Sequence, residues 1–267
     1  MNGAPRHIAV AGATGRVGRH VVDVLESRGC EVVAMARSTG VDVVSGAGLD
    51  EALAGVDCII DTATSASPEQ GAATEFFTAA ARNLHATGKR AGVDRIVVVS
   101  IIGCDRFTAG YNAAKAAHEE AMLAGPIPVR ILRAAQFHEF VAQLLDWGRQ
   151  GEVGYVPKMC TQLVAARTVA EALVNLASAS DAEVQGDSIP EVAGPRAERL
   201  VDAARLVAER RGEPRRVEEL SDRQDPDREL FEEGGLLPGP HATLAGPTFE
   251  DWLAATEVDV EAKGSAA

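Results

Sequence analysis

The fold of this chain is decided by the stretch His7-Ile-Ala-Val-Ala11 and the GATGRVG that follows it from Gly12 to Gly18. This pattern is typical of an apolar strand that ends in a glycine turn and opens a helix. Gly12 permits the tight turn, Gly15 lets the backbone approach a pyrophosphate, and Gly18 lets the helix pack closely on the strand. The start of the helix offers free N–H groups and a positive dipole end, so the turn predicts a dinucleotide site.

The surrounding residues favour this interpretation over a purely structural glycine turn. The spacing is G-x-x-G-x-x-G, which departs from G-x-G-x-x-G, so the glycines alone are a weak signal. The helix after the turn carries apolar residues at helical spacing, namely Val17, Val21, Val24 and Leu25. A second strand over residues 31–36 completes a βαβ unit. Together these features predict that a dinucleotide binds here.

Strands and helices alternate through the first half of the chain. Apolar and β-branched runs predict further strands at 41–44, 56–60, 95–99 and 129–132. Helical patterns between them cover residues 49–53, 72–91 and 111–124. This alternation predicts an α/β protein with a Rossmann-like, doubly wound parallel sheet, whose ligands bind at the carboxyl ends of the strands.

The pattern loosens after about residue 134. Helical stretches at 136–149, 167–179, 197–211 and 249–255 are separated by Gly/Pro loops, and 188–193 is a short strand candidate. We expect residues 1–134 to form an NAD(P)-binding Rossmann domain and 135–257 a smaller α/β cap that binds substrate within the same integrated fold. Residues 258–267 are expected to be a flexible tail.

Composition excludes several classes of protein. The 267 residues include 39 acidic and 26 basic side chains, a net charge of −13 that disfavours nucleic-acid binding. The cysteines have neither CxxC pairs nor metal-ligand spacing, so we expect no metal and no disulfide framework; they are Cys30, Cys58, Cys104 and Cys160. A signal peptide and a membrane-spanning run are not apparent, and we expect a cytoplasmic monomer or homodimer that binds a small-molecule substrate.

A second group of residues indicates proton chemistry. Ser100 ends the strand over 95–99, and Tyr111 and Lys115 follow in GYNAAK. Two residues four apart on a helix project from one face, so the phenol and the ammonium share a site. A free tyrosine titrates near ~10, and a nearby ammonium is expected to lower that pKa. Ser100 is placed to hydrogen-bond the same substrate oxygen.

With these motifs, the chain resembles the short-chain dehydrogenase/reductase superfamily, and in detail its atypical, NmrA-like NAD(P)H-binding branch. GATGRVG resembles that branch's GATGxxG turn, and VVVSIIGCD (97–105) followed by YNAAKAAHEEAM (111–122) resembles its serine and YxxxK segment. RAAQFHEF (133–140) is similar to the stretch that often faces the nicotinamide. The resemblance covers nearly the whole chain.

The resemblance implies an oxidoreductase with Ser100, Tyr111 and Lys115 as catalytic residues. It also implies that Lys115 holds the nicotinamide ribose. The residues expected to bind the cofactor are Gly12, Thr14, Gly15, Arg16, Val17, Gly18, Arg37, Ser38, Thr62, Ala63, Lys115, Gln136 and Phe137. Some members of the branch lack the tyrosine and act as redox sensors, and the presence of all three catalytic residue types here favours an enzyme.

The choice between NADP(H) and NAD(H) is read at the end of the second strand. An Asp or Glu there typically holds the ribose 2′-hydroxyl of NAD, whereas this chain has Ala36-Arg37-Ser38-Thr39. Arg37 is suited to pair bidentately with a 2′-phosphate, with Arg16 beside it. The alternative is that both arginines are solvated surface residues. We expect NADP(H).

The function predicted from these residues is reduction of a carbonyl or quinone group by NADPH, with the proton from Tyr111. An apolar wall is expected to select a bulky, uncharged, aromatic or polyketide-like substrate, although part of it serves core packing: Ile101, Ile102, Phe107, Phe137, Phe140, Leu144 and Trp147. His118 is interpreted as a surface or packing histidine. The alternatives are an NmrA-like NADP sensor without turnover, and an isomerase or cyclase that retains the scaffold.

Overall fold

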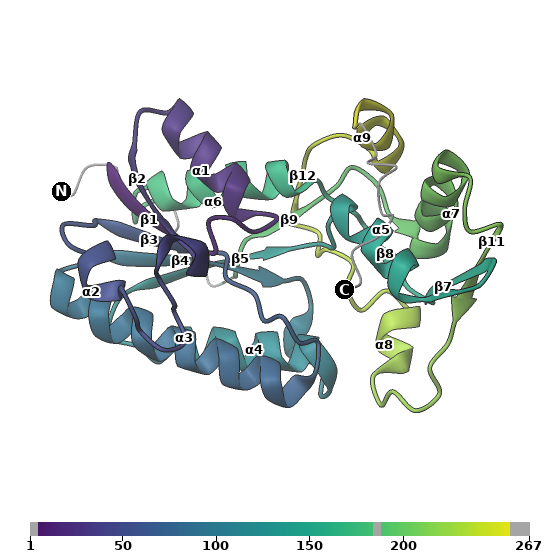
Figure 1. Ribbon diagram of the computed structural model, residues 1–267, viewed down its shortest axis with the longest axis horizontal. Coiled ribbons are helices and arrows are strands. Elements are labelled where there is room, and N and C mark those ends of the chain that lie inside the picture. The colour runs from purple at the N-terminus through teal and green to yellow at the C-terminus, as the bar shows by residue number, and fades with distance from the viewer. Residues whose placement is uncertain (1–4, 184–187, 257–267) are drawn as a thin grey trace.

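A seven-stranded sheet forms the centre of the computed structural model, which describes residues 5–183 and 188–256 (Figure 1). Its strands are β1 (His7–Ala11), β2 (Glu31–Met35), β3 (Cys58–Asp61), β4 (Arg95–Ile101), β5 (Val129–Ala134), β9 (Glu191–Ala193) and β12 (Thr243–Leu244). They lie in the order β2-β1-β3-β4-β5-β9-β12, and all neighbouring pairs are parallel. The predicted Rossmann-like α/β fold is therefore confirmed.

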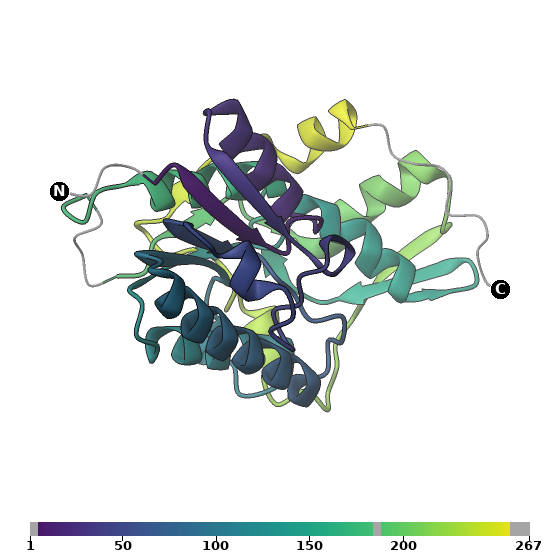
Figure 2. The same ribbon diagram turned by 60° about the vertical axis from the view of Figure 1, so that its left-hand side comes forward.

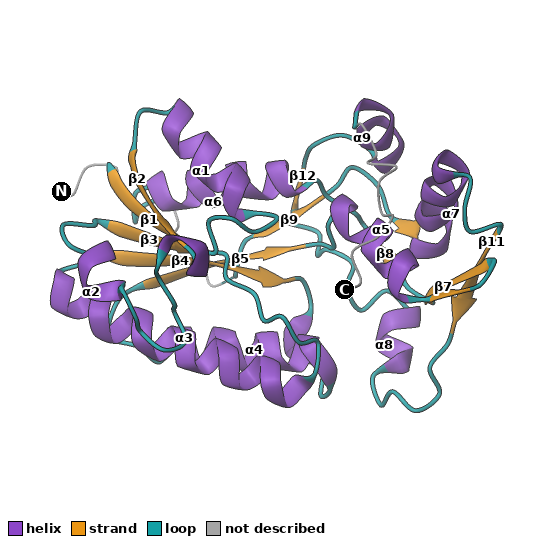
Figure 3. Cartoon of the chain, in the orientation of Figure 1, coloured by secondary structure: helices purple, strands orange, loops and turns teal. Residues whose placement is uncertain are grey.

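Helices cover both faces of the sheet, as the secondary-structure colours of Figure 3 show. One face carries α1 (Gly18–Ser27) and α6 (Ala166–Ser178), which pack against each other. The other face carries α2 (Leu49–Ala52), α3 (Gln70–Ala91) and α4 (Gly110–Leu123), with α3 and α4 side by side. The carboxyl ends of the parallel strands meet at one edge of this three-layer unit, where ligands bind in folds of this kind.

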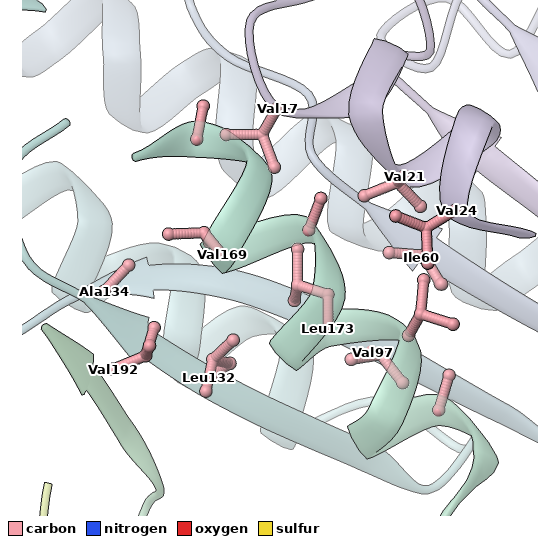
Figure 4. Close-up of a cluster of buried hydrophobic side chains, with 14 of the residues drawn as sticks. Val17, Val21, Val24, Ile60, Val97, Leu132, Ala134, Val169, Leu173 and Val192 are labelled. Carbon is pink, nitrogen blue, oxygen red and sulfur yellow. The ribbon is translucent and has the colours of Figure 1, made fainter. Parts of the chain in front are cut away.

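Buried apolar side chains join the layers. Val169 and Leu173 of α6 and Val24 of α1 pack over the sheet in one core (Figure 4). On β4, Val97 belongs to this core, and Val98 belongs to a second core under α3 and α4. A parallel strand that is covered on both faces is apolar at every position, which is why the run 95–99 predicted its strand correctly.

A smaller group of elements lies beside the carboxyl edge of the sheet (Figures 1 and 2). It consists of α5 (His138–Trp147), β6 (Arg149–Gln150), β7 (Val153–Pro157), β8 (Cys160–Thr161), β10 (Glu198–Arg199), α7 (Leu200–Arg211), β11 (Arg216–Leu220), α8 (Arg228–Glu232) and α9 (Phe249–Ala255). β7 pairs with β6 and β11, and β8 pairs with β10. Val141 and Leu145 of α5 pack with Val207 of α7 in a separate core.

The chain after residue 134 contributes to both groups, because α6, β9 and β12 belong to the large unit. The predicted helices match those observed to within three residues at each end. The predicted division of the chain into residues 1–134 and 135–257 stays a proposal. The predicted tail at 258–267 lies outside the described residues. No helix within the described part of the chain is long and apolar enough to cross a membrane.

The predicted strand at 41–44 is wrong, because these residues form a turn. The Asp42 carboxylate accepts a hydrogen bond from the Val44 N–H at 2.9 Å. Asn83 of α3 donates its side-chain amide to the carbonyls of Val43 and Val44 at 3.0 and 2.6 Å. These side-chain partners satisfy the backbone in place of a neighbouring strand. Val41 and Val43 are still buried, so their apolar pattern reflects packing against the core.

Candidate active site

The glycine turn lies between β1 and α1, as predicted. The N–H groups of Gly12 and Ala13 both donate to the Met35 carbonyl, at 3.0 and 3.2 Å, which holds the turn at the end of β2. Gly12 has a φ of +73°, and a Cβ there would lie 2.8 Å from the Thr62 carbonyl oxygen. A Cβ on Gly18 would lie 2.7 Å from the Gly12 carbonyl carbon. Backbone without side chains at the start of a helix fits the pyrophosphate of a dinucleotide.

Three further residues of the turn have different surroundings. Thr14 is exposed, and Val17 is buried in the core. Arg16 extends to α5, where its Nη2 donates to Gln143 Oε1 at 2.7 Å and its guanidinium lies 5.6 Å from the centre of the Phe140 ring. Burial lowers the pKa of Arg16. Arg16 therefore connects the turn to the smaller group of elements.

Arg37 lies directly after β2 in a short 3₁₀ turn, η1 (Arg37–Thr39). Thr39 closes this turn, because its Oγ1 accepts from the Ala36 N–H at 3.0 Å and donates to the Ala34 carbonyl at 2.9 Å. Arg37 and Ser38 are both exposed. Within residues 5–183 and 188–256, Arg37 has no side-chain hydrogen bond or ion pair, so its guanidinium is available to an anion beside the glycine turn.

The loop after β3 connects the glycine turn to the catalytic candidates. Thr62 Oγ1 donates to the Ala11 carbonyl at 2.7 Å, and a Cβ on Gly12 would lie 2.9 Å from the backbone of Ala63. One residue further, Thr64 Oγ1 lies 2.7 Å from the Tyr111 hydroxyl. Thr62 and Ala63 thus lie against the glycine turn, and Thr64 holds the phenol at the same edge of the sheet.

Tyr111 lies in the first turn of α4, with its ring edge-on to Phe77 of α3 at 5.7 Å between ring centres. Burial raises the pKa of its phenol, and the charge of Asp61 acts in the same direction, while the bond from Thr64 opposes it. The predicted lowering of this pKa is therefore wrong. Burial raises the pKa of the phenol more than Lys115 could lower it, because the ammonium of Lys115 is directed to other partners.

Lys115 is buried one turn further along α4. Its Nζ donates to the Val99 carbonyl at 2.8 Å and lies 4.5 Å from the centre of the Phe77 ring. Burial lowers the pKa of Lys115 to about 8, against the opposing charge of Asp61. The group is therefore an ammonium at neutral pH, at the end of β4.

His118 contacts the same ammonium. Its Nδ1 lies 2.9 Å from Lys115 Nζ, and its Nε2 lies 3.2 Å from Asp61 Oδ2, an ion-pair distance that is poorly aligned for a hydrogen bond. The imidazole stacks on Phe77, with 4.6 Å between ring centres. His118 and Asp61 are each 1% exposed. His118 is thus a packing histidine that also links a lysine to a carboxylate, and it does not lie at the surface.

Ser100 follows Val99 at the end of β4 and has a different set of contacts. Its Oγ lies 3.6 Å from Cys104 Sγ and the residue is 2% exposed. Cys104 in turn donates to Glu119 at 3.3 Å, and Arg133 binds that carboxylate with two hydrogen bonds, at 3.0 and 2.7 Å. Burial raises the pKa of the Cys104 thiol to about 11, so it is a thiol at neutral pH. The structure brings Tyr111 and Lys115 together around Phe77, while Ser100 faces Cys104.

The residues of the stretch 133–140 have different surroundings. Gln136 Oε1 accepts from Thr161 Oγ1 at 2.6 Å, and Phe137 forms a bridge with Val164 and packs against the core. In the expected apolar wall, Ile102 and Phe107 are core residues. The remaining members are half-buried or exposed and lie at the end of β4, directly before α5 and on α5: Ile101, Phe137, Phe140, Leu144 and Trp147.

A family model described as NAD(P)H-binding matches residues 12–180, which is more than half of the chain. The chain belongs to this NAD(P)H-binding family. The match begins at the glycine turn and includes Tyr111 and Lys115, so the candidate site lies within the region that defines the family. No curated protein matches the chain in sequence.

Solved structures share the fold over most of their length. The Bordetella bronchiseptica enzyme WbmG in complex with NAD and UDP is 15% identical, with a TM-score of 0.66 over 95% of this chain and 94% of that chain. MoeE5 in complex with UDP-glucose and NAD is 18% identical, with a TM-score of 0.65 over 88% and 95%. The Thermus thermophilus UDP-glucose 4-epimerase complex with NAD is 18% identical, with a TM-score of 0.62 over 93% and 92%.

The family match confirms the predicted NAD(P)H-binding protein, and the resemblance to short-chain dehydrogenases/reductases stays a prediction. At such identities the likeness to the solved structures shows the fold alone. The choice of NADP(H) over NAD(H), the NmrA-like branch and the substrate stay predictions. Among the described residues, no group of three His, Cys, Asp or Glu side chains is placed to hold a metal ion.

Sequence reasoning missed four residues of the candidate site: Asp61, Thr64, Phe77 and His118. Asp61 and Thr64 lie where the apolar run of β3 ends, and polar residues at such a position are a signal for site residues. His118 lies three residues after Lys115, a spacing that places two side chains on one helix face. Phe77 reads as an ordinary core residue, because nothing in its local pattern indicates that three polar residues surround its ring.

Proposed function

We propose that this protein is an NADPH-dependent reductase of a carbonyl or quinone group in a bulky, apolar small molecule. The observation that carries the proposal is the position of the Tyr111 phenol, which Thr64 holds at 2.7 Å on the loop that packs against Gly12. The phosphate-binding turn and a proton donor are thereby brought to the same edge of the sheet. This is the edge at which ligands bind in doubly wound folds.

Tyr111 is the acid in this proposal. Because burial raises the pKa of its phenol, Tyr111 carries its proton at neutral pH and can give it to an oxygen that gains negative charge. Lys115 supplies a positive charge from the next turn of α4, as expected for a residue that stabilises such an oxygen. Bound NADPH supplies the hydride.

Ser100 remains the third member of the proposed catalytic set, with the role of orienting the substrate oxygen. Its hydroxyl is buried against Cys104, so it must turn away from that thiol to reach a substrate. Tyr111 and Lys115 therefore carry most of the support for catalysis, and a smaller effect is expected from Ser100→Ala than from Tyr111→Phe.

The proposed preference for NADPH rests on Arg37. Its exposed guanidinium follows β2, and the end of β2 accepts hydrogen bonds from the glycine turn at Gly12 and Ala13. No carboxylate stands at that position to hold a ribose 2′-hydroxyl. A planar, permanently charged guanidinium suits a phosphate monoester there.

The proposed substrate class rests on the accessible apolar residues at the end of β4 and along α5. Ile101, Phe137, Phe140 and Leu144 are half-buried, and Trp147 is exposed at 60%. Such side chains favour an apolar ring system, because a hydroxyl-rich ligand needs polar partners that they do not provide. Ile102 and Phe107 are not part of this proposal, since both are buried in the core.

The first experiment measures NADPH consumption with aromatic quinones, aliphatic ketones and nucleotide sugars, all at the same concentration. We expect the highest kcat/KM with an aromatic quinone or ketone. Nucleotide sugars belong in the panel because UDP and UDP-glucose are named in the structures of similar fold. A clear preference for a nucleotide sugar would overturn the proposed substrate class.

The second experiment tests the acid. Tyr111→Phe is expected to lower kcat by ~10²-fold or more, while the Kd for NADPH stays nearly unchanged, because only the transferred proton is lost. Tyr155, the other of the two tyrosines, lies on β7 in the smaller group, and Tyr155→Phe is the matched control. An undiminished kcat in Tyr111→Phe would place the acid elsewhere. NADPH binding without turnover of any substrate would favour a cofactor sensor.

A further inference from the structure

We infer that Asp61 and His118 form a buried positioning pair that fixes the ammonium group of Lys115 in the candidate site. His118 holds Lys115 directly, and Asp61 acts on it through the orientation and tautomer of the imidazole. The geometry of the pair stands on its own, whereas its effect on turnover rests on the proposed function.

The contacts determine which nitrogen of His118 carries the proton. An ammonium group only donates hydrogen bonds, so His118 Nδ1, at 2.9 Å from Lys115 Nζ, must accept. The proton of the neutral ring therefore lies on Nε2, which faces the Asp61 carboxylate at 3.2 Å. Asp61 favours this tautomer, because a carboxylate attracts the N–H and disfavours a bare nitrogen lone pair.

Asp61 also connects this pair to the loop that holds Tyr111. Its Oδ1 accepts from the Ala63 N–H at 2.9 Å, and its Oδ2 faces His118. Ala63 precedes Thr64, whose hydroxyl lies 2.7 Å from the Tyr111 hydroxyl. One carboxylate at the end of β3 thus supports both the loop of the proposed acid and the lysine of the next helical turn.

Charge balance requires a carboxylate close to Lys115. Lys115 is 4% exposed, and a buried cation is costly unless an opposite charge and hydrogen bonds compensate it. The titratable groups that act on it are Asp61 from β3, Cys104 from the turn after β4, and Glu119 and His118 from α4. Glu119 is bound by Arg133 and Cys104 is a thiol, so Asp61 is the carboxylate that balances Lys115.

The arrangement leaves one donor of Lys115 for a ligand. Of the three N–H groups of the ammonium, one is directed to the Val99 carbonyl and one to His118 Nδ1. Without the imidazole acceptor the flexible lysine side chain gains other orientations. Without the Asp61 charge the buried ammonium releases its proton at a lower pH.

Side-chain ¹⁵N NMR of the full-length protein tests the pair without any turnover. We expect His118, assigned from its absence in His118→Phe, to be neutral at neutral pH with its proton on Nε2, because burial lowers its pKa. In Lys115→Met the pKa of His118 is expected to rise, because Lys115 lowers it in the native protein. A protonated His118 at neutral pH, a proton on Nδ1, or an unchanged titration in Lys115→Met would overturn the inference.

Kinetics then test the positioning role. Asp61→Asn keeps the shape and the acceptor for Ala63 but removes the charge, so the alkaline limb of kcat against pH should move down by about one pH unit, a tenfold change in proton affinity. Glu120→Gln, an exposed carboxylate on the same helix, should leave the profile unchanged. His118→Asn keeps an acceptor near the Nδ1 position and should retain more activity than His118→Phe.

An Asp61→Asn profile that coincides with the native one would exclude the positioning role. Thermal unfolding of every variant shows whether it is folded, and His118→Asn serves as the folded variant if His118→Phe is unstable. A protein that turns over no substrate would contradict the proposed function, and the NMR measurements would still decide the inference.

Discussion

At the scale of single residues, burial decides which ionisable groups keep their usual chemistry. Burial raises the pKa of Cys104 to about 11 and lowers that of His138 to about 4, so both are neutral at pH 7. His138 bonds the Leu163 carbonyl at 3.0 Å and is a core histidine. Lys115 is also shifted by burial, to about 8, but retains its charge because Asp61 lies nearby.

Arg37 gives the first prediction at this scale. Arg37→Asp should weaken NADPH binding by on the order of 1.5–3 kcal/mol, tenfold or more in Kd, because a charged bidentate contact is lost and a repulsive carboxylate replaces it. NADH should bind as well as before or better. Titration calorimetry with both cofactors measures the difference.

Arg28→Asp is the matched control for net charge. Arg28 is exposed at the opposite end of α1, where it bonds Asn175 at 2.9 Å, so cofactor binding should be unaffected. Equal affinity of the native protein for NADPH and NADH would contradict the proposed role of Arg37.

At the scale of elements, local hydrogen bonding and close approach decide where strands and helices begin and end. The valine run at 41–44 predicts a strand, but the side chains of Asp42 and Asn83 satisfy its backbone and a turn forms. In the glycine turn, the space available for a Cβ atom decides where the helix can begin. Gly18 opens α1 directly against the backbone of Gly12, so the helix can start there only without a Cβ.

Gly18→Ala is therefore expected to destabilise the protein. The added Cβ would lie 2.7 Å from the Gly12 carbonyl carbon and 2.8 Å from Thr62 Oγ1, and the backbone of Gly12 cannot move away without displacing the turn. Overpacking of this kind costs about 1–3 kcal/mol in the free energy of unfolding, and the displaced turn should also bind NADPH more weakly. Denaturant unfolding and calorimetry measure the two effects.

Gly71→Ala in α3 provides the comparison, because nothing lies within 4 Å of a Cβ at that position. Alanine favours a helix over glycine, so this variant should be as stable as the native protein or more stable, by up to about 1 kcal/mol. Equal stability of Gly18→Ala and Gly71→Ala would show that the turn adapts.

At the scale of the whole molecule, the smaller group is joined to the start of α4. Asp227, which precedes α8, accepts hydrogen bonds from the backbone N–H groups of Thr108 and Ala109 at 2.7 and 2.8 Å and from the Thr108 hydroxyl at 2.9 Å. The carboxylate fixes the two residues that lead into the helix that carries Tyr111, and a negative charge near the N-terminus of a helix is favourable. A residue distant in sequence thereby supports the proposed acid.

Asp227→Ala should lower the free energy of unfolding by about 1–3 kcal/mol, because it leaves backbone N–H groups without their partner. It should also reduce kcat, since Tyr111 lies in the first turn of α4. Denaturant unfolding and hydrogen exchange at residues 108–110 measure the loss. Asp202→Ala, which removes an exposed ion pair with Arg205, should change stability by less than ~0.5 kcal/mol. Similar losses in both variants would contradict a specific role for Asp227.

The sequence by itself determined the class of fold and indicated NAD(P)H binding, since both depend on short-range patterns. Glycines in a β-turn-α unit and apolar runs in buried strands are local consequences of backbone geometry and burial, so GATGRVG and the run 95–99 could be interpreted without the rest of the chain. The tertiary structure alone decided the partners of the polar residues. Tyr111 meets Thr64, Lys115 meets His118 and Asp61, and Ser100 faces Cys104 because separate strands and helices bring these side chains together. Burial then sets their pKa values, and burial is a property of the packed molecule.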